Sequence, residues 1–332
     1  MKDQSIQSSF TNLDESDEHT LRPQILEEFV GQPEVKEKLS IFIGAAKKRK
    51  EALGHALFYG PPGVGKTTLA HVISKAMGTQ LTVTSGPALE KAGDLAGLLT
   101  NLKEGDILFI DEIHRLSASL AEYLYPAMED FRLDLVIDSG PAARSVKLSL
   151  QPFTLIAATT RHALLPSPLR SRFPFSCRIG YYTPETLQQI VQRSAHVLHV
   201  NIEEKACYAI AQRSRGTPRI ANNLLRWVRD FAQTKGVQIV EESLAKEALS
   251  LLSIDEKGLD EMDKRILHTL IHHYQGRIVG INAIAAALGE HVATIEDHES
   301  FLVMHGFVQR LPRGRQATDL AYTHLGLKPK ID

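Results

Sequence analysis

The chain has 332 residues, 43% hydrophobic and 23% charged, which excludes wholesale disorder and predicts two or three domains with real cores. Its 38 basic and 39 acidic residues leave a net charge of -1, which excludes a global basic field, so that any DNA contact must be local. Cys177 and Cys207 lie in no ligand spacing, so we expect two buried, inert thiols and neither a disulfide framework nor a zinc site.

The N-terminal part of the chain is acidic and polar. It lacks the basic start and apolar segment of a signal peptide, and no apolar run reaches the length of a membrane span, so we expect a cytoplasmic protein. Residues 1–20 are unpatterned and are expected to form a disordered tail.

Residues 21–182 alternate short apolar runs with helical patterns, as in a parallel sheet that is buried on both faces. The apolar runs cover residues 56–59, 107–110 and 153–158. A helical pattern begins directly after Lys66 and is expected to end at Gly78.

Three further segments have patterns of their own, one within this large α/β domain and two after it. Residues 131–150 alternate on both sides of a turn signal and predict an inserted β-hairpin. Residues 183–254 have helical periodicity and are rich in arginine, which indicates a small helical domain. Residues 255–332 contain three short helical patterns and then a strand, a basic turn and a strand, which is typical of a winged-helix domain.

The strongest chemical signal is the run GPPGVGKT that follows the first apolar run. Gly60, Gly63 and Gly65 allow the backbone to curl so that its N–H groups face phosphate oxygens, and the following helix adds its positive end. Lys66 would place a charge on the β and γ phosphates, and the Thr67 hydroxyl would ligate Mg²⁺. ATP or ADP and Mg²⁺ are the expected ligands.

Polar residues also end the second and third apolar runs. Asp111 would hold the Mg²⁺ shell, and Glu112 would orient and polarise the attacking water. Thr159 and Thr160 are suited to bind the γ phosphate or that water, although a capped strand end is the simpler interpretation of these threonines alone.

Arginines that reach a transferred phosphoryl group accelerate its transfer by about 10³–10⁵-fold. Arg172, in the run SRF, and Arg219, in the run GTPR, are candidates for this role because of the motifs that surround them.

In this order the motifs resemble the RuvB family of AAA+ motors, which drive branch migration of Holliday junctions. The similarity extends from Leu21 almost to the C-terminus and includes the runs DEIHRL, PAMEDF, GPAARS, SPLRSRF, RSRGTPRIA and PRGR. The resemblance implies an α/β fold with an AAA+ P-loop large domain that has a parallel sheet, a small helical lid domain and a C-terminal winged-helix domain. It also implies a homohexameric ring around duplex DNA.

The resemblance further implies roles for individual residues. Thr160 would be the sensor 1 residue, Arg219 the sensor 2 residue in the lid, and Arg172 an arginine finger that acts on the ATP of the neighbouring subunit. The remaining nucleotide contacts would come from Leu21, Arg22, Thr68, Glu129, Asp130, Phe131 and Tyr182.

The family's partners would bind outside the nucleotide site. Leu135 and Ile137, near the tip of the hairpin, correspond to the segment that docks on RuvA, the junction-binding partner, and RuvC resolvase would join the larger assembly. Arg310, Arg313 and Arg315 form a local basic cluster suited to DNA phosphates. On sequence alone, hairpin packing and a solvated basic turn are the simpler alternatives.

The chain departs from the family pattern at several positions, none of which removes a catalytic group. Pro174 and Ala157 replace usual glycines, Asn223 and Trp227 replace basic residues, and Asp138 begins a pair that replaces a glycine turn. Pro174 is expected to alter the presentation of the neighbouring arginine finger.

Two other functions remain open at this point. A clamp-loader-like AAA+ subunit has similar finger motifs, but a C-terminal winged helix is foreign to that group. A nucleotide-gated DNA-binding switch would bind ATP without turnover, and it needs neither Glu112 nor Arg172. His268 and His272 have a spacing that suits a metal, but no acidic third ligand accompanies them. We therefore expect an ATP hydrolase that moves duplex DNA in recombination and repair.

Overall fold

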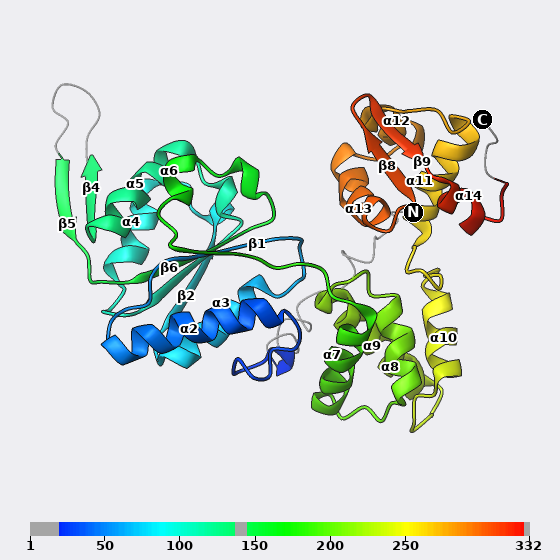
Figure 1. Cartoon of the computed structure of the whole chain (residues 1–332), viewed down its shortest axis with the longest axis horizontal. Helices are drawn as coiled ribbons and strands as arrows, with labels where there is room; N and C mark the ends of the chain where they lie inside the picture. The colour runs from blue at the N-terminus through cyan, green and yellow to red at the C-terminus, as the bar shows by residue number, and fades with distance from the viewer. Residues whose placement is uncertain (1–19, 137–144, 329–332) are drawn as a thin grey trace. The chain divides into compact units, whose positions relative to one another are not determined.

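The computed structural model describes residues 20–136 and 145–328 (Figure 1). The chain folds as two compact units. Of the described residues, the first unit contains those up to His199 together with Gly216–Asn222, and the second contains Val200–Arg215 together with those from Asn223 onward. None of the helices in the described ranges combines the length and the apolar character that a bilayer span requires.

A five-stranded parallel sheet forms the centre of the first unit, with the strand order β2-β3-β6-β1-β7. Its strands are β1 (Ala56–Tyr59), β2 (Leu81–Ser85), β3 (Ile107–Asp111), β6 (Thr154–Thr159) and β7 (Phe175–Arg178). The inner strands β1, β3 and β6 are almost wholly buried, which is why their sequences are apolar throughout. They confirm the three predicted strands. The edge strands β2 and β7 are partly exposed and carry no such run.

Helices cover both faces of this sheet. Figure 1 shows α2 and α3 on one face and α4, α5 and α6 on the other. Their bounds are α2 (Pro33–Arg49), α3 (Lys66–Met77), α4 (Ala92–Thr100), α5 (Ala118–Glu129) and α6 (Ser167–Arg170). Short 3₁₀ turns lie between them at η1 (Gly86–Ala88), η2 (Ile113–Arg115) and η3 (His162–Leu164). As predicted, α3 begins in the phosphate loop and ends at Gly78, which has a left-handed φ of 73°.

The register of the sheet brings the polar ends of its strands to one edge. Tyr59 lies beside Thr159, and Ser85 lies beside Asp111. The phosphate loop follows β1 directly, so it meets the last residues of β3 and β6 at the carboxyl edge, where α/β sheets bind their ligands.

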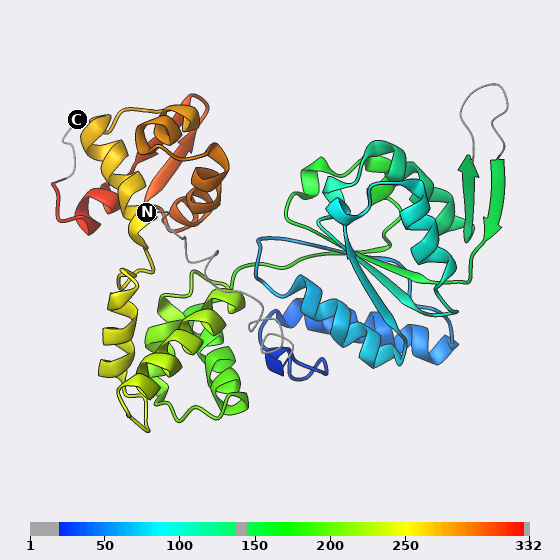
Figure 2. The same cartoon turned by 180° about the vertical axis from the view of Figure 1, so that it is seen from behind.

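An antiparallel pair stands apart from the sheet where the sequence predicts the hairpin (Figure 2). It consists of β4 (Arg132–Val136) and β5 (Ser145–Ser149), with Leu133 opposite Leu148. The segment that joins the two strands, including Ile137 and the Asp138 position, lies outside the described residues. The predicted tail over residues 1–20 also lies outside them, apart from Thr20.

The first unit also contains α7 (Pro184–Val197) and the first turns of α9 (Pro218–Thr234). The second unit contains α8 (Glu204–Gln212), the rest of α9 and α10 (Glu242–Leu251). All four helices fall in the segment for which the sequence predicts helices.

The second unit ends in a separate apolar core made by three helices and a β-hairpin, as the winged-helix pattern predicts. The elements are α11 (Glu261–His268) with its π-helical extension η4 (Thr269–His273), α12 (Ile281–Leu288), α13 (Val292–Met304), β8 (Val308–Leu311) and β9 (Gly314–Ala317). A final short helix, α14 (Asp319–His324), was not predicted, because six residues show too little periodicity. Val279 forms a bridge with Arg315 that adds a third segment beside the hairpin.

Gly314 makes this bridge possible. Its φ is 153°, and a Cβ at this position would lie 2.3 Å from the carbonyl oxygen of Val279. We therefore expect Gly314→Ala to destabilise the winged-helix domain by about 1–3 kcal/mol. Calorimetric unfolding measures the effect. Gly97→Ala in α4 is the control, because that site is open and alanine favours a helix by about 0.5–1 kcal/mol. Equal melting temperatures for Gly314→Ala and the wild type would contradict this account.

Candidate nucleotide site

The phosphate loop has a backbone that only glycine adopts readily. Gly60, Gly63 and Gly65 have φ values of 148°, 75° and 97°. A Cβ at Gly60 would lie 2.0 Å from the carbonyl oxygen of Ile179, so the loop could not pass there with a side chain. The loop leads into the N-terminus of α3 at Lys66, where free N–H groups and the helix dipole favour an anion. The loop is therefore a suitable cradle for phosphate groups.

Lys66 lies within this cradle and is buried. Its ammonium donates hydrogen bonds to the carbonyl oxygens of Gly60 at 3.0 Å and Pro61 at 2.7 Å. Burial lowers the pKa of Lys66, and the nearby carboxylates of Asp111 and Glu112 oppose that shift. The loop thus holds a lysine whose charge has little solvent around it, and phosphate oxygens would be strong partners for it.

Thr67 and Asp111 come together from two different elements. The Thr67 hydroxyl donates to Asp111 Oδ2 at 3.4 Å, and the backbone N–H of Glu112 donates to Asp111 Oδ1 at 2.9 Å. A hydroxyl and a carboxylate are oxygen ligands of the kind that Mg²⁺ prefers. The donor set therefore fits the predicted metal.

Glu112 is held in a strained backbone conformation with a φ of 47°. Its Oε2 accepts hydrogen bonds from the Thr160 N–H at 3.1 Å and from the Thr160 hydroxyl at 3.0 Å. The same oxygen lies 3.1 Å from His114 Nδ1. The structure thus joins Glu112 and Thr160, the two residues predicted to act on the attacking water.

His114 is a site residue that the sequence reasoning missed. It lies in the turn η2, and its Nδ1 lies 2.9 Å from the Thr159 hydroxyl as well as close to Glu112. Burial lowers the pKa of His114, and the charge of Glu112 opposes the shift. The ring is therefore neutral near pH 7. Its position two residues after Glu112 was the only signal available in the sequence.

A cavity of about 180 Å³ opens beside the phosphate loop within the first unit. The predicted residues that line it are Leu21, Arg22, Gly63, Gly65, Lys66, Thr67, Thr68, Asp111, Glu112, Tyr182 and Arg219. The lining also includes Ile190, Arg193 and Asn222, which the sequence did not single out. They come from α7 and α9, and helical periodicity alone does not tell which helix face meets a cavity.

Arg193 holds the segment that precedes α2, which includes Leu21 and Glu28, beside the cavity. Its guanidinium donates to the Leu21 carbonyl oxygen at 2.8 Å and pairs with Glu28 at 3.1 Å. Arg22 lies 3.0 Å from His71 Nε2, which ties the same segment to α3. The Tyr182 hydroxyl donates to the Val64 carbonyl oxygen at 3.0 Å, and burial raises the pKa of Tyr182. These contacts hold in place several of the residues that line the cavity.

Arg172 and Glu129 do not line this cavity. They pair with each other at 2.9 Å, and the Arg172 guanidinium also lies 4.6 Å from the ring centre of Tyr125. Within the described residues, the buried Nε of Arg172 has no hydrogen-bond partner. Asp130 is exposed and pairs with Arg132 at 3.3 Å. The structure thus places Arg172, the predicted arginine finger, beside Glu129, which was predicted as a further nucleotide contact.

Phe131 and Thr68 are the last two residues predicted to contact the nucleotide, and they lie in different places. Phe131 has a φ of 50° and packs against Phe153, with 6.0 Å between ring centres. It follows Asp130 at the end of α5, whereas Thr68 lies in the first turn of α3 at the cavity.

The predicted DNA contacts in the wing differ in their surroundings. The side chain of Arg310 is 66% exposed, and Arg313 at the turn is also exposed. Arg315 is only 14% exposed, and it forms two hydrogen bonds with the buried Glu299, at 2.9 and 3.0 Å. Arg310 and Arg313 are therefore better placed to meet a phosphate backbone than Arg315.

The remaining sequence signals have simple structural outcomes. Both cysteines are buried and free, which confirms the predicted burial, and burial raises the pKa of Cys177 and raises that of Cys207 to about 11. His268 and His272 stack on each other with 5.4 Å between ring centres. The potential ligand group found in the described parts of the chain is Asp260, Asp263 and His298, which includes neither of them.

A covered parallel sheet, a phosphate loop before α3 and an adjacent pair of carboxylates define a P-loop ATPase of the AAA+ class. Three family models match consecutive parts of the chain. They are the Holliday junction DNA helicase RuvB P-loop domain over residues 21–179, the RuvB AAA lid domain over 182–255 and the RuvB C-terminal winged helix domain over 256–326.

Individual relatives agree with these models. The Holliday junction branch migration complex subunit RuvB of Protochlamydia amoebophila (strain UWE25) is 58% identical over 321 residues, which cover 96% of this chain and 97% of that protein. The structure of the Thermotoga maritima RuvB Holliday junction branch migration motor is 47% identical, with a TM-score of 0.84, over 94% of this chain and 100% of that one. A mutant of the same motor gives a TM-score of 0.86 at 47% identity, over 93% and 99% of the two chains. The chain belongs to the RuvB family, and the predicted fold class is confirmed.

His114 provides a test of how Glu112 is positioned. We expect His114→Ala to lower kcat by up to about 100-fold, because a misplaced general base loses that much, with little change in nucleotide affinity. His114→Asn, whose amide can replace the Nδ1–H donor, should lose less. Because the pKa of His114 is lowered, the ring stays neutral and the defect should be constant from about pH 7 to 9. Steady-state phosphate release measures kcat, and an unchanged kcat in His114→Ala would contradict a positioning role.

Proposed function

We propose that this RuvB-family chain is a motor that hydrolyses ATP between the subunits of a homohexameric ring and thereby drives branch migration of Holliday junctions. The observation that carries the proposal is the separation of the catalytic groups. The phosphate loop and Glu112 meet at the cavity, whereas Arg172 and Glu129 lie together outside it. A finger that lies outside its own cavity is suited to a neighbour's site, and a heterologous contact of this kind generates a ring when its rotation closes.

The residues at the cavity support the following roles. Lys66 and Arg219 would bind the phosphates and stabilise the charge that develops on them. Glu112, held by Thr160, would orient the attacking water and accept its proton. Mg²⁺ would be held by Thr67 and Asp111, and when bound it supplies further neutralisation of the phosphate charge.

The outer parts of the cavity suit the rest of a nucleotide. Leu21, Arg22 and Tyr182 line the region that Arg193 fastens, and they would contact the base and ribose. Arg172, together with the exposed surface around Glu129, would complete the site of the adjacent subunit.

The other proposed contacts follow the family. The wing would bind duplex DNA through Arg310 and Arg313, whose exposure supports a phosphate contact, with a smaller direct part for Arg315. Leu135 and Ile137 of the hairpin would dock on RuvA, and RuvC would act on the same junctions. A cytoplasmic location and a part in the SOS response belong to the same proposal.

The two alternative functions receive less support. A clamp-loader-like subunit would not explain the winged-helix match over residues 256–326. A switch without turnover would not need the contacts that hold Glu112 in place, nor a finger arginine.

Mixing two inactive variants tests the shared site. Lys66→Ala and Arg172→Ala should each lower ATPase activity by at least about 10³-fold, because each removes a positive charge that would stabilise the phosphoryl group during its transfer. Mixed rings should regain activity, since random assembly makes about a quarter of the interfaces intact. Phosphate release after mixing is the measurement.

The matched control mixes Lys66→Ala with Glu112→Gln. Both defects lie on the cavity side, so no interface becomes intact and activity should stay at background. Recovery in this control, or its absence in the Lys66→Ala and Arg172→Ala mixture, would show that the site is not divided between subunits.

A four-way junction tests the overall activity. With RuvA, Mg²⁺ and ATP, the wild-type protein should dissociate a mobile junction into duplexes, and a non-hydrolysable nucleotide should not support the reaction. The variant Arg310→Ala/Arg313→Ala should retain DNA-free ATPase activity but lose junction dissociation, because its wing loses phosphate contacts. No ATP-dependent dissociation by the wild type would refute the motor assignment.

A further inference from the structure

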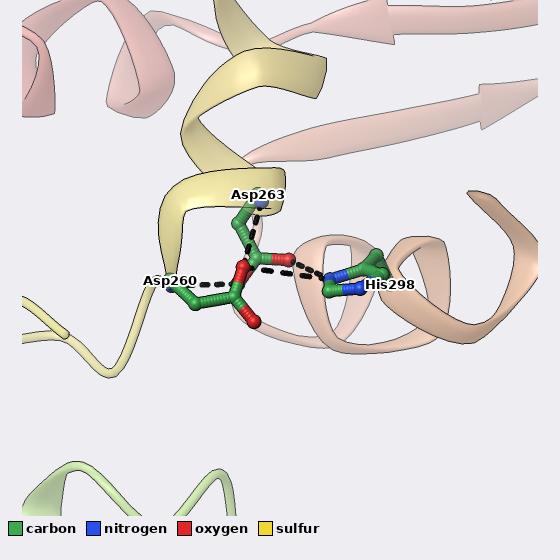
Figure 3. Close-up of side chains that lie close together, drawn as sticks. All are labelled: Asp260, Asp263 and His298. Carbon is green, nitrogen blue, oxygen red and sulfur yellow. Dashed lines mark hydrogen bonds and ion pairs between the residues drawn. The ribbon is translucent and has the colours of Figure 1, made fainter. Parts of the chain in front are cut away.

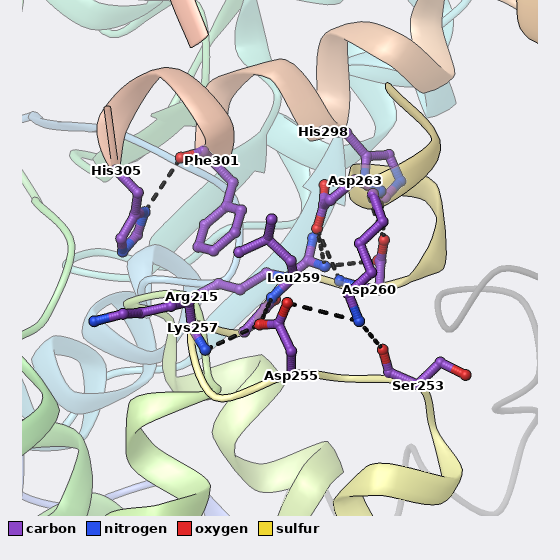
Figure 4. Close-up of polar contacts among 12 residues, drawn as sticks. Arg215, Ser253, Asp255, Lys257, Leu259, Asp260, Asp263, His298, Phe301 and His305 are labelled. Carbon is purple, nitrogen blue, oxygen red and sulfur yellow. Dashed lines mark hydrogen bonds and ion pairs between the residues drawn. The ribbon is translucent and has the colours of Figure 1, made fainter. Parts of the chain in front are cut away.

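Arg215 forms a network of polar contacts within the second unit, shown in Figure 4. Its Nη2 donates to Asp260 Oδ2 at 2.6 Å and to Asp263 Oδ2 at 2.5 Å. Its Nε donates to the carbonyl oxygen of Gly258 at 2.9 Å. The guanidinium also lies 4.7 Å from the ring centre of Phe301 in α13. One side chain therefore holds the segment before α11, the first turn of α11 and α13.

The two aspartates are part of the N-terminus of α11. Asp260 caps the helix by accepting the Asp263 N–H at 2.9 Å, and Asp263 accepts the Asp260 N–H at 3.0 Å. His298 Nδ1, in α13, lies 2.7 Å from Asp263 Oδ1 and 3.7 Å from Asp260 Oδ1 (Figure 3). The cluster therefore ties Arg215 to two helices of the winged-helix domain.

The cluster is buried, so its charges interact strongly. The side chain of Asp263 is fully buried, and those of Arg215, Asp260 and His298 are each 15% exposed. Burial would raise the pKa of Asp260, but Arg215 and His298 outweigh that effect and hold it below its usual value. Burial would lower the pKa of His298, but Asp263 and Asp260 raise it. The guanidinium lies between the two carboxylates where a metal ion would otherwise bind, so the group is an ion-pair network and not a metal site.

The position of Arg215 in the chain gives this network its significance. Arg215 immediately precedes Gly216, and both residues have left-handed φ values, 51° and 70°. Gly216 accepts the Tyr182 N–H at 2.9 Å, and Arg219, three residues farther on, lines the nucleotide cavity of the first unit. The backbone therefore runs from the winged-helix network to the nucleotide cavity within five residues, Arg215–Arg219.

We propose that Arg215 is a positioning residue that couples ATP turnover to DNA movement by fastening the start of the segment Gly216–Arg219 to α11 and α13 of the winged-helix domain. A displacement of Arg219 during turnover would then move the winged-helix domain, which carries the proposed DNA contacts, instead of being absorbed in a loose loop. This inference rests on the proposed motor function. It assigns Arg215 no contact with nucleotide or DNA.

The chemistry of arginine suits this role better than that of lysine. The planar guanidinium contacts two carboxylates, a carbonyl oxygen and an aromatic face at once, whereas an ammonium on a flexible stem cannot hold all four. The sequence alone would assign Arg215 to the arginine-rich lid. Its partners are more than forty residues away in the chain and become visible only in the fold.

The test measures ATP hydrolysed per junction dissociated, a ratio that a merely destabilised protein would not change. For Arg215→Ala we expect DNA-free ATPase activity and duplex affinity near the wild-type values, but at least about tenfold more ATP consumed per junction. Arg215→Lys, which keeps the charge, should fall between. Arg229→Ala is the control, because Arg229 pairs with its neighbour Asp230 within α9 and should leave the ratio unchanged.

A double-mutant cycle keeps the inference open to refutation if one variant folds poorly. Asp260→Asn, which retains a capping oxygen, should raise the ratio in the same direction, and Arg215→Ala/Asp260→Asn should be no worse than Arg215→Ala, because both changes remove one interaction. The inference would be overturned if soluble Arg215→Lys and Asp260→Asn both consumed the wild-type amount of ATP per junction. It would also be overturned if the effects of Arg215→Ala and Asp260→Asn on this ratio were additive in the double variant. Failure of the wild-type protein to dissociate junctions would instead refute the motor function itself.

Discussion

The parallel pairing of β6 with β3 on one side and β1 on the other is the constraint on which the nucleotide site depends. Burial of the three strands fixes their register, because a shift would expose apolar side chains and orphan buried backbone groups. His55 supports β6, since its Nδ1 accepts the N–H of Leu155 at 2.8 Å. With the register set, the phosphate loop, Asp111 and Thr159 have to meet at one edge.

The edge that results holds an anion cradle and two carboxylates, and under the proposed function part of the positive charge comes from a neighbouring subunit. Lys66 and Arg219 are at the cavity, whereas Arg172 lies outside it beside Glu129. Glu112 is meanwhile held by Thr160 and His114. With Glu112 as the proposed base and Arg172 as the proposed finger, this arrangement suits an enzyme in which hydrolysis has to wait for the correct arrangement of a neighbouring subunit.

A motor also has to carry small changes at a phosphate group to a distant DNA-binding surface. Packed, buried contacts carry displacement better than exposed loops, because they do not deform gradually. The network around Arg215 is packed and buried in this way. Its charged groups are each paired, and these pairings restrict the positions of the side chains. The exposed Arg310 and Arg313 of the wing have the opposite character, which suits contacts that form and break as DNA moves.

The sequence by itself determined the elements and the chemistry that depend on local pattern. Buried parallel strands need continuous apolar runs, and a phosphate loop needs glycines. Lys66, Asp111 and Glu112 follow these runs, so the covered sheet and the polar edge that holds these residues could be predicted. Only the tertiary structure decided which side chains meet across the chain: His114 beside Glu112, Arg193 on the Leu21 carbonyl, Glu299 on Arg315, and Arg215 between Asp260 and Asp263. These partnerships depend on helix rotation and loop path, which the packing of the whole fold determines and no local periodicity encodes.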